Sequence, residues 1–192
     1  MVTPRIIVVG ASAGGLSVLE KIISSIDVLP IPLVIVQHIS PDSGDSVLRL
    51  LKKYSSIPFT EPIDKEGLEE NHIYLAPPDY HVMIEHDKSF SLYLGPKENF
   101  CRPAIDLLFE TAAEVYKDGV LGIILTGANR DGLRGCQKIK LFHGTVIAQN
   151  PEEAQVPVMP KAVVSEGLAD HVLNIDEICI MINSVLKGVI DG

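Results

Sequence analysis

Short, wholly apolar runs, each followed by a segment with helical periodicity, constrain the fold of this chain most. Three such runs are Ile6–Val9, Leu33–Val36 and Val120–Leu125. Runs of this length and composition are typical of strands that are buried on both faces of a parallel sheet. Because strands and helices alternate, the sequence predicts an α/β fold: a doubly wound, mostly parallel sheet with helices on both faces.

The remaining elements fit the same architecture. Two runs, His81–Glu85 and Phe90–Leu94, flank a polar turn and predict one antiparallel β-hairpin. Further short strands are expected at 73–76, 145–148 and 171–173. Helices are expected at 16–26, 47–54, 103–116, 132–142, 161–164 and 176–186. With 192 residues and no apparent linker or repeat, we expect residues 1–192 to form one domain.

Composition and charge narrow the class of protein. The chain is 46% hydrophobic and carries a net charge of −9, which argues against nucleic acid as a partner. Three widely spaced cysteines without a C-x-x-C motif favour a reducing compartment. We find no signal peptide and no apolar stretch long enough to span a membrane. We therefore expect a cytoplasmic protein that does not insert into a membrane.

The segment RIIVVGASAGG, residues 5–15, joins the first predicted strand to a helix. Ser12 stands where a dinucleotide-binding loop needs glycine, and no acidic residue ends the next strand. A phosphate-binding loop is also excluded, because Leu16 and Ser17 follow Gly15. The segment does match G-x-S-x-G between strand and helix, the context of a nucleophile elbow. A tight turn with a capping serine is the structural alternative.

A nucleophilic serine needs a base and a carboxylate that orients the base. The second predicted strand ends near His38, and the strand Val120–Leu125 leads to Asp131. The carboxyl ends of parallel strands share one edge of the sheet, so Ser12, His38 and Asp131 are candidates for a catalytic triad. Their order along the chain differs from that of α/β-hydrolases. No H-x-x-H or H-E-x-x-H pattern occurs, and we predict neither a metal site nor a cofactor.

With these segments identified, the chain resembles the catalytic domain of the chemotaxis protein-glutamate methylesterases, the CheB family. The segments that carry the resemblance are VVGASAGG, VIVQHISP, IYLAPPDYHV, RPAIDLLFETAA, IILTGANRDGLRG and GTVIAQNPEEAQVPVMPKAVVSEGLAD. The resemblance implies that Ser12 is the nucleophile, His38 the general base and Asp131 its orienting residue. It also implies hydrolysis of γ-glutamyl methyl esters on the cytoplasmic helices of methyl-accepting chemotaxis receptors. Some family members also deamidate receptor glutamines.

The sequence departs from the family pattern in the expected pocket. Ala128 and Asn129 replace the methionine and glycine of T-G-M-G-x-D-G, and Ala13 stands where many members have threonine. Many members also carry an N-terminal receiver domain. This sequence begins at the first catalytic strand, so we expect a stand-alone catalytic domain, controlled by a separate protein or by the signalling state of the receptor itself.

Two further groups of residues are assigned by their positions around the expected crevice. The tetrahedral oxyanion would be bound by N–H groups near Ala13 and Gly14, with Ala128 also lining the pocket. Basic side chains flank the crevice and are candidates for contacting a glutamate-rich receptor helix, with solvated surface charge as the alternative: Lys97, Arg102, Arg130 and Arg134. Two rival functions remain, a nucleotide-binding module and a docking domain without catalytic activity.

Overall fold

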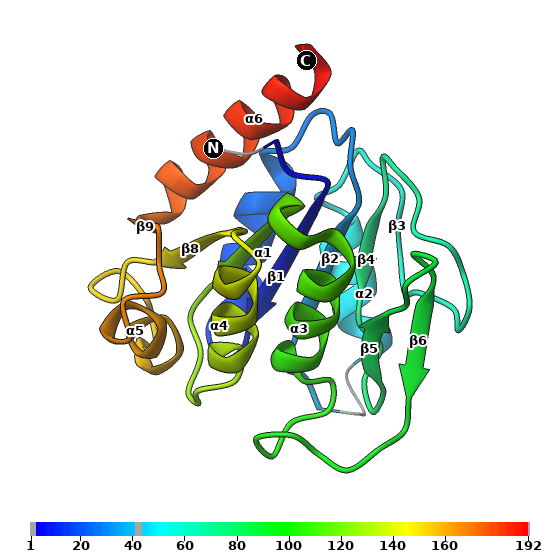
Figure 1. Cartoon of the computed structure of the whole chain (residues 1–192), viewed down its shortest axis with the longest axis horizontal. Helices are drawn as coiled ribbons and strands as arrows, with labels where there is room; N and C mark the ends of the chain where they lie inside the picture. Colours follow the sequence, from blue (N-terminus) through cyan, green and yellow to red (C-terminus); the bar gives the residue numbers. More distant parts are fainter. Residues whose placement is uncertain (1–2, 41–43, 192) are drawn as a thin grey trace.

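The structure is a computed structural model that describes residues 3–40 and 44–191. Within these residues a seven-stranded sheet has the order β3-β4-β2-β1-β7-β8-β9, and every pairing in it is parallel (Figure 1). Its strands are β1 (Ile6–Ala11), β2 (Leu33–Gln37), β3 (Phe59–Thr60), β4 (Ile73–Leu75), β7 (Val120–Ile124), β8 (Thr145–Gln149) and β9 (His171–Leu173). The predicted hairpin is also present, as the antiparallel pair β5 (His81–Ile84) and β6 (Phe90–Tyr93).

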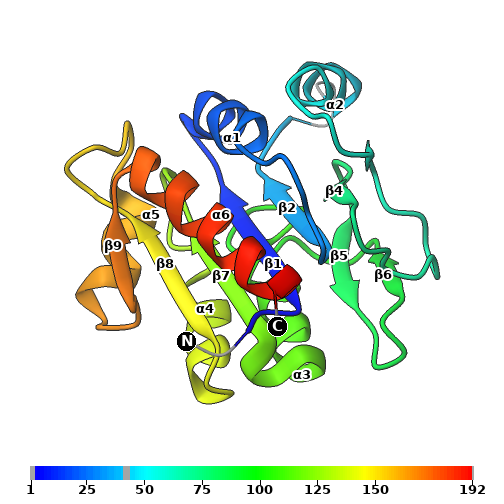
Figure 2. The same ribbon diagram turned by 90° about the horizontal axis from the view of Figure 1, so that it is seen from above.

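Six α-helices of the described residues cover the two faces of the sheet. One face packs against α1 (Gly15–Ser24), α2 (Gly44–Lys52) and α6 (Ile175–Asp191). The other packs against α3 (Ile105–Tyr116), α4 (Leu133–Leu141) and α5 (Val158–Ser165), together with the hairpin. Figure 2 shows α1 and α2 on the opposite side of the strands from α3 and α4. The predicted doubly wound α/β fold is therefore confirmed.

The alternation of side chains along the central strand explains these two layers. Ile7 and Val9 of β1 belong to the core beneath α1 and α6, whereas Ile6 and Val8 belong to the core beneath α3. All four side chains are fully buried. A strand covered on both faces has no solvent-facing position, which is why its sequence is an unbroken apolar run.

Differences from the sequence prediction lie at the periphery of the fold. Strand β3 was not predicted, because two residues are too few to show any periodicity. Helix α5 begins at Val158 instead of residue 161, and α6 continues to Asp191 instead of residue 186. A short 3₁₀ turn, η2 (Lys117–Gly119), precedes β7. None of the helices described here has the length and hydropathy that crossing a membrane requires.

The register of the central strands determines where the site lies. Ala11, the last residue of β1, pairs with Gln37, the last residue of β2. On the other side of β1, Gly10 pairs with Ile124, the last residue of β7. The three strands therefore end together, and the loops that follow them emerge side by side at one edge of the sheet.

Candidate active site

Ser12 directly follows β1, in the tight connection to α1. Its N–H donates to the Thr126 carbonyl (3.0 Å), and its own carbonyl accepts from the Gly15 N–H (2.9 Å). Gly14 has a φ of 79°, in the left-handed region that favours glycine. The backbone on both sides of Ser12 is thus fixed, and the serine is presented between a strand end and a helix start.

His38 follows β2 and is attached to the loop that carries Ser12. Its N–H donates to the Ala11 carbonyl (3.0 Å), and the Gln37 amide donates to the Ser12 carbonyl (2.9 Å). These bonds hold Nδ1 of His38 3.2 Å from Oγ of Ser12. The predicted nucleophile and base are therefore within hydrogen-bond reach of each other.

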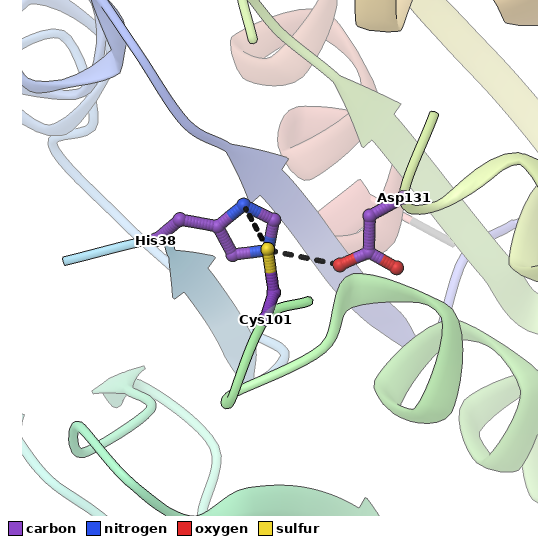
Figure 3. A group of neighbouring side chains, drawn as sticks. All are labelled: His38, Cys101 and Asp131. Carbon is purple, nitrogen blue, oxygen red and sulfur yellow. Dashed lines mark hydrogen bonds and ion pairs between the residues drawn. The ribbon is translucent and has the colours of Figure 1, made fainter. Parts of the chain in front are cut away.

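Asp131 reaches the same ring from the loop after β7. Oδ2 of its carboxylate lies 2.8 Å from Nε2 of His38, and the Asp131 side chain is fully buried (Figure 3). The backbone N–H groups of Ile105 (2.7 Å) and Asp106 (3.1 Å), at the start of α3, also donate to this carboxylate. Burial opposes ionisation, but the bonds from His38 and the helix start outweigh it and lower the pKa of Asp131. The carboxylate is thus kept charged and oriented.

The protonation of His38 is set by the same neighbours. Burial of the ring disfavours its charged form, but the hydrogen bond to Asp131 and the proximity of Cys101 prevail. Together they raise the pKa of His38 from 6.5 to about 9. The site therefore stabilises an imidazolium, the species that His38 becomes on accepting a proton from Ser12.

The neutral ring has one tautomer that satisfies both contacts. With a proton on Nε2, the ring donates to Asp131, and its Nδ1 accepts from the Ser12 hydroxyl. In the Ser-His-Asp triad of the chymotrypsin type the two nitrogens have the opposite roles, with Nε2 facing the serine. Either ring nitrogen can act as the base when a hydrogen bond fixes the proton on the other nitrogen. The arrangement can therefore support nucleophilic catalysis.

Ala13 and Gly14, two of the three residues expected around the oxyanion, border a cleft in front of Ser12. A cleft of about 440 Å³ is lined by Ser12, Ala13, Gly14 and His38, among others. Within the described residues, the N–H groups of Ala13 and Gly14 have no hydrogen-bond acceptor in the protein. Ala128 is exposed and follows Gly127, where an added Cβ would lie 2.9 Å from Cβ of Ser12. The backbone at Gly127 therefore passes close to the serine.

Comparison with known proteins shows the family of the chain. A family model described as CheB methylesterase matches residues 7–182. The chain belongs to the CheB methylesterase family. It is 43% identical over 173 residues to the putative protein-glutamate methylesterase/protein-glutamine glutaminase of Leptospira interrogans serovar copenhageni, covering 90% of each chain. It is 38% identical to the protein-glutamate methylesterase/protein-glutamine glutaminase of Thermotoga maritima, covering 90% of this chain and 51% of that protein.

A solved structure of the CheB family confirms the fold. The crystal structure of the Thermotoga maritima CheB methylesterase catalytic domain superposes with a TM-score of 0.88 at 36% sequence identity. The match covers 97% of this chain and 99% of that domain. The predicted membership of the CheB methylesterases is thereby confirmed, and with it the expectation that the chain is an enzyme of this family.

Three of the four basic residues expected to dock a CheB substrate, the arginines, are already paired with acceptors in this structure. The Arg102 guanidinium donates to the Gly95 carbonyl (2.6 Å) and to Asp79 (3.1 Å). Arg130 pairs with Glu166 at 3.2 Å. Arg134 pairs with three carboxylates on its own side of the sheet: Glu98, Asp106 and Glu110. Lys97 is exposed. A docking role for these arginines therefore requires an acidic substrate to compete with these partners.

Sequence reasoning missed Asn99 and Cys101, which lie in the loop between β6 and α3 and complete the site of this CheB domain. The Asn99 amide donates to both Asp131 (3.2 Å) and Asp106 (3.0 Å). Cys101 places Sγ 3.4 Å from Nδ1 of His38 and accepts a hydrogen bond from the Asn129 amide (3.2 Å). This loop has no periodicity that would mark Asn99 and Cys101. Their one signal in the sequence is that they lie just before the RPAID segment.

Proposed function

We propose that this chain is a serine hydrolase that removes methyl esters from γ-glutamyl side chains on the cytoplasmic helices of chemotaxis receptors. The observation that carries the proposal is the position of His38, 3.2 Å from Oγ of Ser12 and 2.8 Å from Oδ2 of Asp131. The names of the related proteins supply the substrate class, protein-bound glutamate esters. Under this proposal residues 1–192 act as one catalytic domain in the cytoplasm.

The first half of the reaction forms an ester between Ser12 and the glutamyl group. Oγ of Ser12 attacks the ester carbonyl while its proton passes to Nδ1 of His38. The tetrahedral intermediate collapses, the bond to the methoxy oxygen breaks, and His38 returns the proton to release methanol. Asp131 accepts the Nε2–H throughout and stabilises the imidazolium.

The second half of the reaction regenerates the enzyme with water. Nδ1 of His38 takes a proton from a water molecule that attacks the acyl carbonyl, and the bond to Oγ of Ser12 then breaks. The proton returns to Ser12, and the glutamate leaves as a carboxylate. A cleft of about 440 Å³ in front of Ser12 has room for this water and for a glutamyl side chain.

The oxyanion of both tetrahedral intermediates needs donors that are in place beforehand. The N–H groups of Ala13 and Gly14 meet this requirement, since they lie beside Ser12 at the start of α1, where the helix dipole favours negative charge. We assign them as oxyanion donors, with the Ala128 segment nearby. Removing one such donor typically lowers kcat by about 10²–10³-fold.

A second activity follows from the same acyl-enzyme. The relatives' names include protein-glutamine glutaminase, and a glutamine side chain differs from the methyl ester only in its leaving group. His38 would then donate its proton to a departing amine, and ammonia would be released instead of methanol. Receptor glutamines are therefore the second substrate that we assign to this site.

The test is methanol release from methylated receptor cytoplasmic fragments by the purified chain. We expect turnover by the wild type and none by Ser12→Ala, with ammonia release measured in parallel on fragments that carry glutamine. A folded wild type that binds the fragments and releases neither product is the result expected of a docking domain. That result would overturn the hydrolase proposal.

A further inference from the structure

The donor atoms around His38 go beyond those that ester hydrolysis needs. Among residues 3–40 and 44–191, one group brings histidine, cysteine and carboxylate donor atoms within 4.8 Å of one another: His38, Cys101 and Asp131. Figure 3 shows the Cys101 side chain extending from its loop toward the imidazole, while Asp131 approaches from another loop. The thiol forms and breaks no bond in the acyl transfer proposed above.

We propose that His38 and Cys101 form a binding site for Zn²⁺, and that the bound ion switches the hydrolase off by occupying Nδ1 of His38. Imidazole and thiolate are the donors that zinc takes most readily. The inhibitory half of this inference rests on the proposed function, but the binding half does not. His38 and Cys101 are 63 residues apart, so no short sequence pattern could reveal them.

The distances suit a single tetrahedral ion. Zinc bonds of about 2.0–2.1 Å to nitrogen and about 2.3 Å to sulfur place two such donors roughly 3.5 Å apart. Sγ of Cys101 lies 3.4 Å from Nδ1 of His38, and Oγ of Ser12 lies 3.2 Å from the same nitrogen. An ion bound by Nδ1 and Sγ would complete its tetrahedral shell with two further ligands, such as water or the Ser12 hydroxyl.

Asp131 acts as the outer partner of this site and is not itself a ligand. Its carboxylate is buried and already accepts from Nε2 of His38 and from the N–H groups at the start of α3. Histidines that bind metals commonly donate their second N–H to a carboxylate, which fixes the ring and strengthens it as a donor. The Asp131–His38 pair has this form, with Nδ1 directed to the proposed ion.

A hydrogen bond from a fixed amide holds Sγ of Cys101 in place. The Asn129 amide donates to Sγ (3.2 Å), and the Asp131 N–H donates to the amide oxygen of Asn129 (3.1 Å), so the amide is held with its NH₂ toward sulfur. The charges of a thiolate and of Asp131 together offset the two charges of the ion. His38 borders the cleft in front of Ser12, which gives the ion a route of entry.

Binding changes bonds but no oxidation state. The S–H bond of Cys101 breaks and a Zn–S bond forms, and the Nδ1–H bond of a protonated His38 breaks as well, with both protons passing to solvent. The lone pair of Nδ1 enters a Zn–N bond and is no longer available to the Ser12 proton. Hydrolysis therefore stops while the ion is bound, and a chelator that removes the ion restores it.

The binding half is tested on the purified, chelator-treated chain without substrate. We expect calorimetry to show one Zn²⁺ per chain, and Co²⁺ to give the near-ultraviolet absorption of a thiolate–cobalt bond. Cys101→Ala should lose this band and weaken Zn²⁺ binding at least tenfold, and His38→Gln should weaken it similarly. Cys179→Ala, which removes a buried thiol where α6 packs on α1, is the matched control and should bind as the wild type does.

The inhibitory half is read as the esterase rate with Zn²⁺ divided by the rate without it, for each variant separately. In the wild type and in Cys179→Ala, we expect this ratio to be about 0.1 or less and to return to about one when a chelator is added. In Cys101→Ala, we expect the ratio to stay near one. Wild-type binding without a thiolate–cobalt band, or unchanged affinity in Cys101→Ala, would overturn the site. Binding with the band but without inhibition would overturn the switch. Because cobalt is read without substrate, failure of the esterase proposal leaves the binding test intact.

Discussion

Nε2 of His38 lies 2.8 Å from Oδ2 of Asp131, whose side chain is completely shielded from solvent, whereas the His38 side chain remains 11% exposed. The buried partner holds the ring, and the exposed edge of the ring meets Ser12. Nε2 thus fixes the orientation of the ring through Asp131, and Nδ1 is the nitrogen that accepts the proton of Ser12.

Asp131→Asn should lower kcat by about 10⁴-fold, because an amide can stabilise the wrong tautomer of His38. It should also reduce the free energy of unfolding by about 1–3 kcal/mol, since an amide N–H₂ would face backbone donors at the start of α3. Esterase assays and urea denaturation measure the two effects. Asp118→Asn, at an exposed ion pair with Arg5, is the control and should change neither quantity appreciably.

Ser12→Ala should abolish esterase activity, with a loss of at least about 10³-fold, and leave the fold intact. The hydroxyl of Ser12 contacts His38 but supports no element of the core. Initial rates of methanol release and the thermal midpoint measure the two outcomes. A folded Ser12→Ala protein with near-normal rates would show that another group is the nucleophile.

The pH profile should report the protonation of His38. The ring accepts the Ser12 proton only when neutral, and its surroundings raise its pKa to about 9. Activity should therefore rise with pH, and kcat/KM should level off only above about pH 9, instead of near the ordinary value of about 6.5. Measurements from pH 6 to 10 test this, and a plateau reached by pH 7 would contradict it. Cys101→Ala should move the rise to lower pH, because proximity of Cys101 helps to raise the pKa.

Gly10→Ala should impair both stability and catalysis. An added Cβ would lie 2.5 Å from Cγ2 of Ile105, the first residue of α3, whose N–H donates to Asp131. Overpacking of this kind costs about 1–3 kcal/mol, and any displacement of α3 also moves the carboxylate that orients His38. Gly67→Ala, where nothing lies within 4 Å of an added Cβ, is the matched control. Denaturation and esterase assays on both variants give the comparison.

Neither NAD nor ATP should raise the melting temperature. The position where a dinucleotide site has its acidic residue is occupied by Gln37, whose amide instead donates to the carbonyls of Ser12 and His38. Thermal shift at low millimolar nucleotide measures this. A clear upward shift with either nucleotide would revive the nucleotide-binding alternative.

The sequence predicted those parts of the fold whose signal is local. Strands such as Ile6–Val9 are buried on both faces, and their composition alone reveals them. The rule that parallel strands end at one edge was enough to bring Ser12, His38 and Asp131 together. Cys101 could not be placed in this way, because its approach to His38 depends on how α3 packs over the sheet. Likewise, β3 is defined only by its pairing with β4.

The direction of α3 has a practical consequence. Its first residue, Ile105, contacts Asp131, whereas Tyr116 at its other end lies under Lys88 in the β5–β6 turn. Twelve helical residues span roughly 18 Å, so the β5–β6 turn and the reacting atoms lie at opposite ends of α3. A fluorophore or surface tether attached at Lys88 would therefore report on or immobilise the enzyme without crowding the bound ester.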